Sequence, residues 1–360
     1  MKNLIIREYK TGDEKQIIQL FQKVFGKPMG KTESIKHWNW EYKNNPNNRI
    51  EILLAIDENQ IVGHYSVIPI KMKIKEDYFI TSLSLDTMTH SKYRGQGIFP
   101  TLANKLYKDL GETGIPFTYG FPNNNSIKPF VKKCGWCEIS NVPIYILPLN
   151  ISKLAARYLK SKFFSFFIGG IFNFIFNLLW KEKNLPNRIE IEEIKKFDKT
   201  FDDLWELVKD EIIIGVVRDC EYLNWRYFLK PEDNYVVYAI NLNNNLKGYI
   251  VLKIEVRFDL TIGLIVDIIT DPSNIVYQHY LIKYAILYFK RKKVDIISVI
   301  MFPHWRYYKS LIRNKFVKII KILFPEDVYF GVRKNSETID FQLIKNPKNW
   351  YLTWGDTDVV

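Results

Sequence analysis

Two periods of apolar residues alternate along the first part of the chain. Helical spacing is seen at residues 17–25 and at Ile98, Leu102, Leu106 and Leu110. Runs with strand character lie around these helices, at residues 4–7, 50–56, 61–73, 79–89 and 116–121. This order predicts an α/β domain with helices around a central mixed sheet.

The same pattern occurs a second time. The segment Trp38-Asn39-Trp40-Glu41-Tyr42, with Pro46 after it, matches Leu223-Asn224-Trp225-Arg226-Tyr227, with Pro231 after it, 185 residues later. Further matches follow in order at nearly the same offset: Ala55 with Ala239, Gly63 with Gly248, Asp86 with Asp267, and Phe121-Pro122 with Phe302-Pro303. The chain is therefore predicted to contain two copies of one domain of a usual size.

The repeat sets the expected domain boundaries. We expect a first domain at 1–148, an apolar helical linker at 149–187, a second domain at 188–335, and a terminal strand with an acidic tail at 336–360. Within the linker, residues 163–180 are mostly apolar with lysines on both sides. This run is interpreted as a helix packed between the domains, with a helix lying in a membrane interface as the alternative.

Charge and cysteine content narrow the function only slightly. The 52 Lys and Arg against 39 Asp and Glu give a net charge of +13, which fits an anionic partner or a compositional bias of the genome. Three cysteines are too few for a disulfide framework, and Cys134 and Cys137 have no second pair to complete a zinc site. With no signal peptide apparent at the N-terminus, a cytoplasmic protein without a metal is expected, or one peripheral to the inner face of the membrane through 163–180.

A glycine-containing loop is the strongest chemical signal. The strand ending near Thr89 runs into Arg94-Gly95-Gln96-Gly97, and a helix follows from Ile98. Helix N-termini present free N–H groups and positive potential, so this loop is a candidate pyrophosphate site. The glycines let a ligand approach the backbone, and Arg94 adds charge.

This stretch resembles the acyl-CoA motif of the GNAT acetyltransferase family. The resemblance implies two tandem GNAT-like domains and acetyl-CoA, or another acyl-CoA, as co-substrate. The resemblance also implies that the acyl-CoA is contacted by the following residues: Met88, Thr89, Arg94, Gly95, Gln96, Gly97, Ile98, Phe99 and Asn124. Phe99 departs from the family, which has a small residue there, and Val131 stands where the usual tyrosine acid would be. Residues 267–274 of the second copy lack the motif, so one acyl-CoA site is expected.

Asp86 and His90 are the candidate general bases. Period-two alternation puts both on one face of the predicted strand, where either could accept a proton from an amine. A structural role remains open for each of them. The match of Asp86 with Asp267 in the copy without the motif favours structure for that residue.

Aromatic residues are candidates to line an acceptor groove: Trp38, Trp40, Tyr42 and Tyr119. Because both copies keep the tryptophan motif, packing is the alternative. In the survival-protein group of tandem GNAT proteins the C-terminus reaches the N-terminal active site, so residues 350–360 either do likewise or form a last strand with a solvated acidic tip.

The predicted function is an acyl-CoA-dependent N-acyltransferase acting on a small-molecule or sugar amine. Nucleic acid is not the expected partner. One alternative is an aminoacyltransferase like the FemABX proteins, which use charged tRNA, although the loop at Arg94–Gly97 argues against it. A second alternative is a non-catalytic acyl-CoA-binding scaffold.

Overall fold

The computed structural model describes residues 4–26, 35–150, 153, 185–186, 188–231, 234–257, 259–319 and 327–358. These form two compact units, each discontinuous in sequence. Unit 1 contains Met1–Val142, Ile212–Asp233 and Glu326–Trp350, and unit 2 contains Pro143–Glu211, Asn234–Pro325 and Tyr351–Val360. The apolar run at 163–180 lies outside the described residues.

Unit 1 is built on a mixed sheet with the strand order β1-β2-β3-β4-β5-β15-β6. The strands are β1 (Ile5–Glu8), β2 (Glu51–Asp57), β3 (Gln60–Ile74), β4 (Asp77–Thr89), β5 (Phe117–Gly120), β15 (Tyr329–Lys334) and β6 (Cys137–Asn141), and β9 (Ile214–Val216) pairs with β3. The helices are α1 (Glu14–Phe25), α2 (Ile35–Trp38), α3 (Ile98–Glu112), α4 (Ile127–Cys134), α8 (Cys220–Tyr227) and α11 (Phe341–Lys345), with the π-helical turn η1 (Asn39–Lys43) and the 3-10 turns η2 (Ser91–Tyr93) and η4 (Pro347–Asn349).

Unit 2 repeats this architecture. Its sheet, taken from the other edge, has the order β8-β10-β11-β12-β13-β7-β14. The strands are β8 (Ile189–Ile194), β10 (Tyr235–Leu242), β11 (Asn245–Arg257), β12 (Leu260–Thr270), β13 (Ile296–Ile300), β7 (Ile144–Pro148) and β14 (Val317–Lys318). The helices are α7 (Thr200–Val208), α9 (Val276–Arg291) and α10 (Tyr307–Arg313), with 3-10 turns η3 (Lys209–Glu211) and η5 (Trp354–Asp356). The mixed α/β fold and the internal repeat predicted from the sequence are confirmed.

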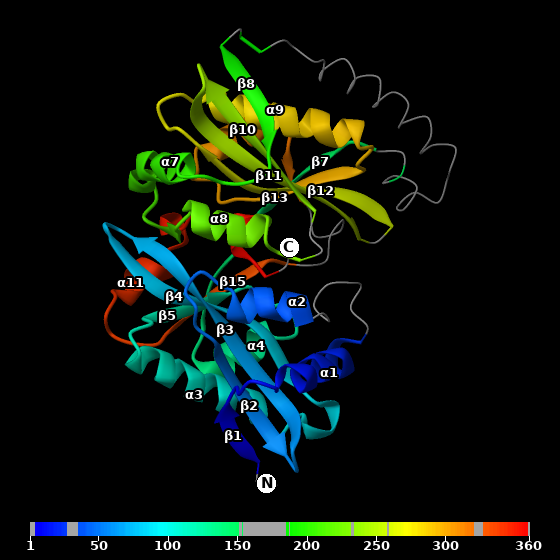
Figure 1. Cartoon of the computed structure of the whole chain (residues 1–360), viewed down its shortest axis with the longest axis vertical. Helices are drawn as coiled ribbons and strands as arrows, with labels where there is room; N and C mark the ends of the chain where they lie inside the picture. The colour runs from blue at the N-terminus through cyan, green and yellow to red at the C-terminus, as the bar shows by residue number, and fades with distance from the viewer. Residues whose placement is uncertain are drawn as a thin grey trace. The chain divides into compact units, whose positions relative to one another are not determined.

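The two copies exchange one strand each. β15, from the end of the second copy, lies among the strands of the first copy (Figure 1), where it pairs with β5 on one edge and β6 on the other. β7, from the end of the first copy, pairs with β13 and β14 of the second. Because the inserted strand pairs on both of its edges, each sheet depends on a segment distant in sequence. The expected boundaries at 148 and 188 do not include this exchange, which local patterns do not encode.

The core of unit 1 lies between its sheet and α3. The apolar stripe predicted for this helix is buried as expected, with Leu102 and Leu110 both 0% exposed. They pack with β2 and β3 residues such as Leu53, Val62 and Tyr65. The stripe fixes the start of α3 against the sheet, and with it the loop that precedes the helix.

The C-terminal segment differs from the expected strand and acidic tip. Residues 336–358 form α11, η4 and η5, and residues 351–357 are all buried. Asp356 accepts hydrogen bonds from the Thr353 N–H (2.8 Å) and hydroxyl (3.1 Å), which closes the turn η5. A carboxylate with these partners is a helix cap, not a solvated tip.

We predict that a fragment of residues 1–148 does not fold into a stable domain. It lacks β15, so that β5 loses its neighbour and β6 is detached from the sheet. Far-UV circular dichroism during urea titration should show no cooperative transition, whereas co-expression with a 188–360 fragment should restore one. A native-like spectrum and cooperative unfolding of the 1–148 fragment alone would contradict the exchange.

Candidate functional site

Strands β4 and β5 are paired with each other over a very short length. They run parallel and pair only at Ser82 with Thr118 and Leu83 with Tyr119. β5 ends at Gly120, while β4 continues to Thr89 beside β3. A methyl group added to Gly120 would lie 3.3 Å from Cβ of Ser84, so the strands touch there. Beyond this point β4 presents a strand edge with no β5 residue paired to it.

A β-bulge interrupts β4 in this unpaired section. Met88 pairs with His64 and Leu85 with Ser66, which leaves one extra residue on β4. Asp86 lies in the bulge with φ +47°, a left-handed conformation that aspartate tolerates better than most residues. The bulge breaks the period-two alternation on which the prediction of a shared face for Asp86 and His90 was based.

The carboxylate of Asp86 is partly buried beside Tyr42. The Tyr42 hydroxyl donates a 2.8 Å hydrogen bond to Oδ2 of Asp86, and Nδ1 of His64 lies 2.8 Å from the Asp86 carbonyl oxygen. Burial raises the pKa of Asp86 to about 6, against the opposing effect of the Tyr42 hydrogen bond. A carboxylate with this pKa is ionised near neutral pH and suits a general base.

His90 lies at the end of β4 and has a local structural role. Its N–H donates to the Val62 carbonyl (2.9 Å), and its Nδ1 is 3.4 Å from the Lys92 N–H at the start of η2. The ring also contacts Tyr93 edge-on, with 5.7 Å between centroids. These contacts shape the turn into the glycine loop.

The loop itself has the geometry expected from the sequence. Gly95 and Gly97 both have φ +78°, and a Cβ built on either meets no heavy atom within 4 Å. α3 begins at Ile98, and its first intrahelical bond runs from the Thr101 N–H to the Gly97 carbonyl (3.1 Å). The N–H groups of Ile98 and Phe99 belong to the first turn and point outward along the helix axis. Exposed Arg94 and Gln96 flank them.

Phe99 departs from the small residue expected at its position because it fills space. Its ring packs against Phe130 of α4 at 4.8 Å and Tyr65 of β3 at 6.0 Å between centroids. The side chain therefore contributes to the core, and only its backbone N–H belongs to the loop surface.

At the start of α4 the sequence contains adjacent asparagines with different roles. Oδ1 of Asn123 accepts from the N–H groups of Asn125 (2.9 Å) and Ser126 (3.1 Å), an Asx turn that leads into the helix. Asn124, the predicted cofactor contact, is exposed. Val131, at the position of the usual tyrosine, is 39% exposed on α4.

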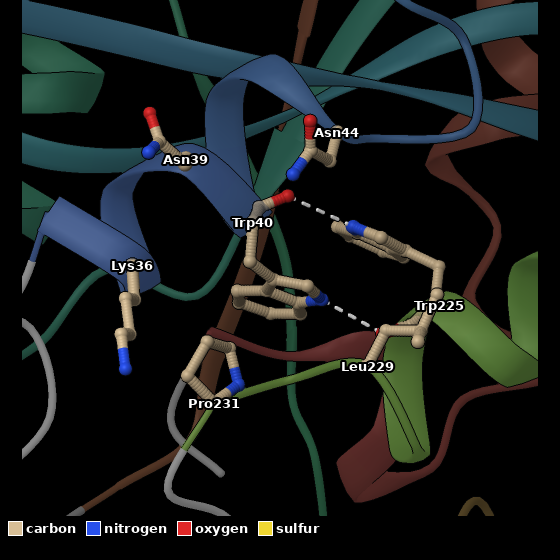
Figure 2. Close-up of a pocket in the computed structure, with 7 residues that line it drawn as sticks. All are labelled: Lys36, Asn39, Trp40, Asn44, Trp225, Leu229 and Pro231. Carbon is tan, nitrogen blue, oxygen red and sulfur yellow. Dashed lines mark hydrogen bonds between the residues drawn. The ribbon is translucent and has the colours of Figure 1, made fainter.

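The four aromatic candidates are not equivalent. Trp38, Tyr42 and Tyr119 are at most 4% exposed and pack against other rings, as Trp38 does against Tyr9 at 5.1 Å. Trp40 is buried to a similar extent but borders a cavity of about 350 Å³. The other lining residues are Lys36, Asn39, Asn44, Trp225, Leu229 and Pro231 (Figure 2).

The two repeated tryptophans bind each other reciprocally. Nε1–H of Trp40 donates to the carbonyl of Trp225 (2.7 Å), and Nε1–H of Trp225 donates to the carbonyl of Trp40 (3.0 Å). Their rings stack at 4.9 Å with 16° between planes, and Figure 2 shows both bonds beside the cavity. The sequence repeat pointed to this pair, but its mutual pairing could not be predicted from the two segments taken separately.

In unit 2 the corresponding strand opening is filled. β12 and β13 pair only from Ile262–Leu264 to Ile296–Ser298, and the C-terminal tail lies against the continuation of β12. The Tyr351 hydroxyl donates to the Ile268 carbonyl, the Thr353 hydroxyl donates to Asp267 Oδ1 (3.2 Å), and the Tyr351 ring packs at 4.5 Å on Trp305, which follows β13. The chain's own tail thus occupies the space that is a candidate ligand site in unit 1.

Cys134 is buried and Cys137 partly buried, and both are free thiols. In the described ranges, no group of three or more His, Cys, Asp or Glu side chains is arranged to hold a metal. Nor do the described residues include a helix long and apolar enough to cross a bilayer.

Comparison with known proteins agrees with this geometry. Residues 5–139 match the family model of the acetyltransferase (GNAT) domain. No protein with curated function matches the chain in sequence.

Solved structures share the fold over nearly the whole chain. A GCN5-related N-acetyltransferase from Anabaena variabilis has a TM-score of 0.64 at 12% identity, covering 92% of this chain and 73% of its own. One from Kribbella flavida has a TM-score of 0.60 at 9% identity, covering 92% and 71%. Saccharomyces cerevisiae N-myristoyltransferase with bound myristoyl-CoA has a TM-score of 0.59 at 12% identity, covering 98% and 82%. The family model therefore identifies residues 5–139 as a GNAT acetyltransferase domain, and the solved structures show that this chain shares their fold over nearly its whole length.

Proposed function

We propose that this protein is an N-acyltransferase that binds one acyl-CoA in unit 1 and transfers the acyl group to a small amine. The observation that carries the proposal is the position of the glycine loop. It joins the unpaired end of β4 to the N-terminus of α3, so a phosphate site and an open strand edge are continuous. An extended thioester fits this combination.

Different groups of the described residues are proposed to contact different parts of the acyl-CoA. The N–H groups of residues 94–99 receive the pyrophosphate, and the exposed Arg94 adds positive charge. The unpaired edge of β4 offers backbone hydrogen bonds to the amide arm, with Met88 and Thr89 nearest the thioester. Asn124, exposed before α4, is the proposed contact from the other side.

Asp86 is the base in this proposal. Its carboxylate takes a proton from the acceptor ammonium, the free amine attacks the thioester carbon, and the C–S bond breaks to release CoA thiolate. The attacking nitrogen must lose a second proton to become the amide. Because Val131 cannot donate a proton and Tyr119 is 1% exposed, this second proton reaches the thiolate through water. His90 is the second candidate base, since it lies at the same end of β4.

The acyl group and the acceptor are proposed by class. Acetyl-CoA is the first donor to test, with myristoyl-CoA as the long-chain comparison. The acceptor is proposed to be a small amine or amino sugar, and the cavity beside Trp40 is its candidate site. Its lining combines apolar Leu229 and Pro231 with the amides of Asn39 and Asn44. Contact of residues 163–180 with a membrane surface, and a cytoplasmic location, remain predictions from sequence.

CoA is predicted to bind once per chain. Isothermal titration calorimetry should give one site, because the tail fills the opening in unit 2. A Gly97→Trp change should weaken binding at least about tenfold by covering the loop amides. Gly114→Trp is the matched control, since Gly114 also has positive φ (+85°) and open space around it, but lies beyond α3. Two equivalent sites, or equal affinity of both variants, would refute the assignment.

Removal of the Asp86 charge should slow transfer strongly. Thiol release from acetyl-CoA with a panel of amines should show kcat/KM of Asp86→Asn reduced by about 10²–10⁴. The wild-type value should fall as pH decreases through about 6, because the base becomes protonated. His90→Asn, which keeps a side-chain acceptor for Lys92 N–H, should retain most activity. The reverse ranking of the two variants would make His90 the base. Turnover only with aminoacyl-tRNA would favour the aminoacyltransferase, and no turnover with any donor would favour the non-catalytic acyl-CoA-binding scaffold.

The same substitution should stabilise the fold at neutral pH. The folded-state pKa of Asp86 is raised from 3.8 to about 6, so burial favours the protonated form, and this contribution is lost as pH rises through about 6. Asp86→Asn stays neutral, and its unfolding free energy should exceed that of the wild type by about 1–3 kcal/mol above pH 7, and the difference should vanish at about pH 3, below the unfolded pKa. Thermal melts at both values test this, with exposed Asp77→Asn as control. A pH-independent difference would argue against titration of Asp86.

A further inference from the structure

A polar cluster lies directly behind the candidate base. It consists of Tyr42 from η1 and His64 and Ser66 from β3, each at most 2% exposed, and Asp86 on β4, which is partly exposed. Buried polar side chains are expected to be hydrogen-bonded, and each has a bond within this group. The cluster therefore connects a reacting group to buried side chains that cannot reach the substrate.

The direction of the bond from Tyr42 follows from its partners. An ionised carboxylate only accepts, so the single phenolic hydrogen goes to Oδ2 of Asp86. The Ser66 hydroxyl, 2.9 Å from the phenol, then donates to the Tyr42 oxygen or to the Leu85 carbonyl at 3.2 Å. Burial, and secondly the Asp86 charge, raise the pKa of Tyr42 well above its ordinary value, so the phenol remains a donor.

His64 contacts the backbone of the bulge, at the Asp86 carbonyl. A carbonyl oxygen only accepts, so Nδ1 of His64 carries the hydrogen that the Asp86 carbonyl receives. Nε2 is then an unprotonated nitrogen, and it is buried without a hydrogen-bond partner. Burial lowers the pKa of His64 to about 4, so the ring is neutral at physiological pH. An imidazole in this state fixes the strained backbone and does not exchange protons with solvent.

We propose that Tyr42 and His64 are positioning residues for the base, with Tyr42 aiming the carboxylate of Asp86 and His64 fixing the backbone from which it projects. This inference rests on the proposed function, in which Asp86 accepts the proton. It also gives Tyr42 a role other than the direct substrate contact expected from the sequence. Ser66 completes the hydrogen bonding of Tyr42 without touching Asp86.

The titratable groups around Asp86 determine how the test is interpreted. Tyr42 and Glu41 come from η1, His64 comes from β3, and His90 follows at the end of β4 itself. Oε1 of Glu41 lies 3.9 Å from Nε2 of His37. Only Tyr42 bonds the carboxylate directly among these groups, so its removal is the most selective change.

Tyr42→Phe removes the donor and keeps the ring that packs on Trp38. Loss of a hydrogen bond to the charged form raises the pKa of a carboxyl, so the acid limb of kcat/KM should move upward by about half to one pH unit. Ser66→Ala leaves the bond to Asp86 intact and should leave the limb in place. A uniform loss of rate in Tyr42→Phe, with neither the acid limb nor the pKa of Asp86 moved, would reduce Tyr42 to a packing residue.

The role of His64 is tested by a matched pair. In His64→Asn the side-chain amide N–H can replace Nδ1–H, whereas His64→Phe has a ring and no donor. We expect His64→Asn to keep kcat within about threefold and His64→Phe to lose about tenfold or more, with CoA affinity unchanged in both. Equal kcat values for the two variants would overturn the assignment.

Direct titration separates this inference from the proposed function. Carbon-13 NMR of labelled aspartate carboxyls, with Asp86→Asn to assign the resonance, gives the pKa of Asp86 without reference to activity. If Tyr42→Phe raises that pKa but not the acid limb, the positioning stands and Asp86 is not the base. If the pKa of Asp86 does not change, the positioning fails, whatever the activity shows.

Discussion

The pairing of β4 with β5 over only two residues of each strand is the constraint on which the site depends. Parallel strands normally continue side by side, but here β4 runs on from Leu83 to Thr89 after its pairing with β5 has ended. The edge left on β4 must find hydrogen-bond partners, since unpaired backbone groups are costly when buried. The bulge at Asp86 lies within this section of strand, and the glycine loop and the start of α3 come directly after it in the chain. In the proposed function an acyl-CoA supplies the missing partner.

The comparison of the units shows a second solution to the same problem. In unit 2, β12 also continues beyond the residues that pair with β13, and residues of the C-terminal tail form hydrogen bonds with this continuation. Asp267 is 1% exposed there and bonds Tyr249 and Thr353, whereas Asp86 remains partly exposed. One architecture thus holds an open strand edge in one unit and a filled one in the other. This difference is the physical basis for expecting chemistry in unit 1 alone.

The exchange of β7 and β15 makes each sheet a product of both copies. A strand in the middle of a sheet contributes pairing on two edges, so its loss affects the neighbours on each side. Unit 1 also takes α8 from the second copy, whose Trp225 closes a reciprocal pair of hydrogen bonds with Trp40. η1, the turn that carries Trp40, also carries Tyr42. The packing of the repeated motif is therefore linked, through Tyr42, to the carboxylate of Asp86 that Tyr42 hydrogen-bonds.

The sequence by itself determined the local features. Apolar periodicity located α3, β3 and β4, the repeat revealed the second copy, and the spacing of Arg94, Gly95 and Gly97 identified the loop, because each depends on residues close together in the chain. Tertiary structure alone decided the strand exchange, the filling of unit 2 by the tail, and the cluster of Tyr42, His64 and Asp86. The bulge also broke the alternation that related Asp86 to His90. These features depend on pairing between distant segments, whose energy comes from register and burial that a single segment does not specify.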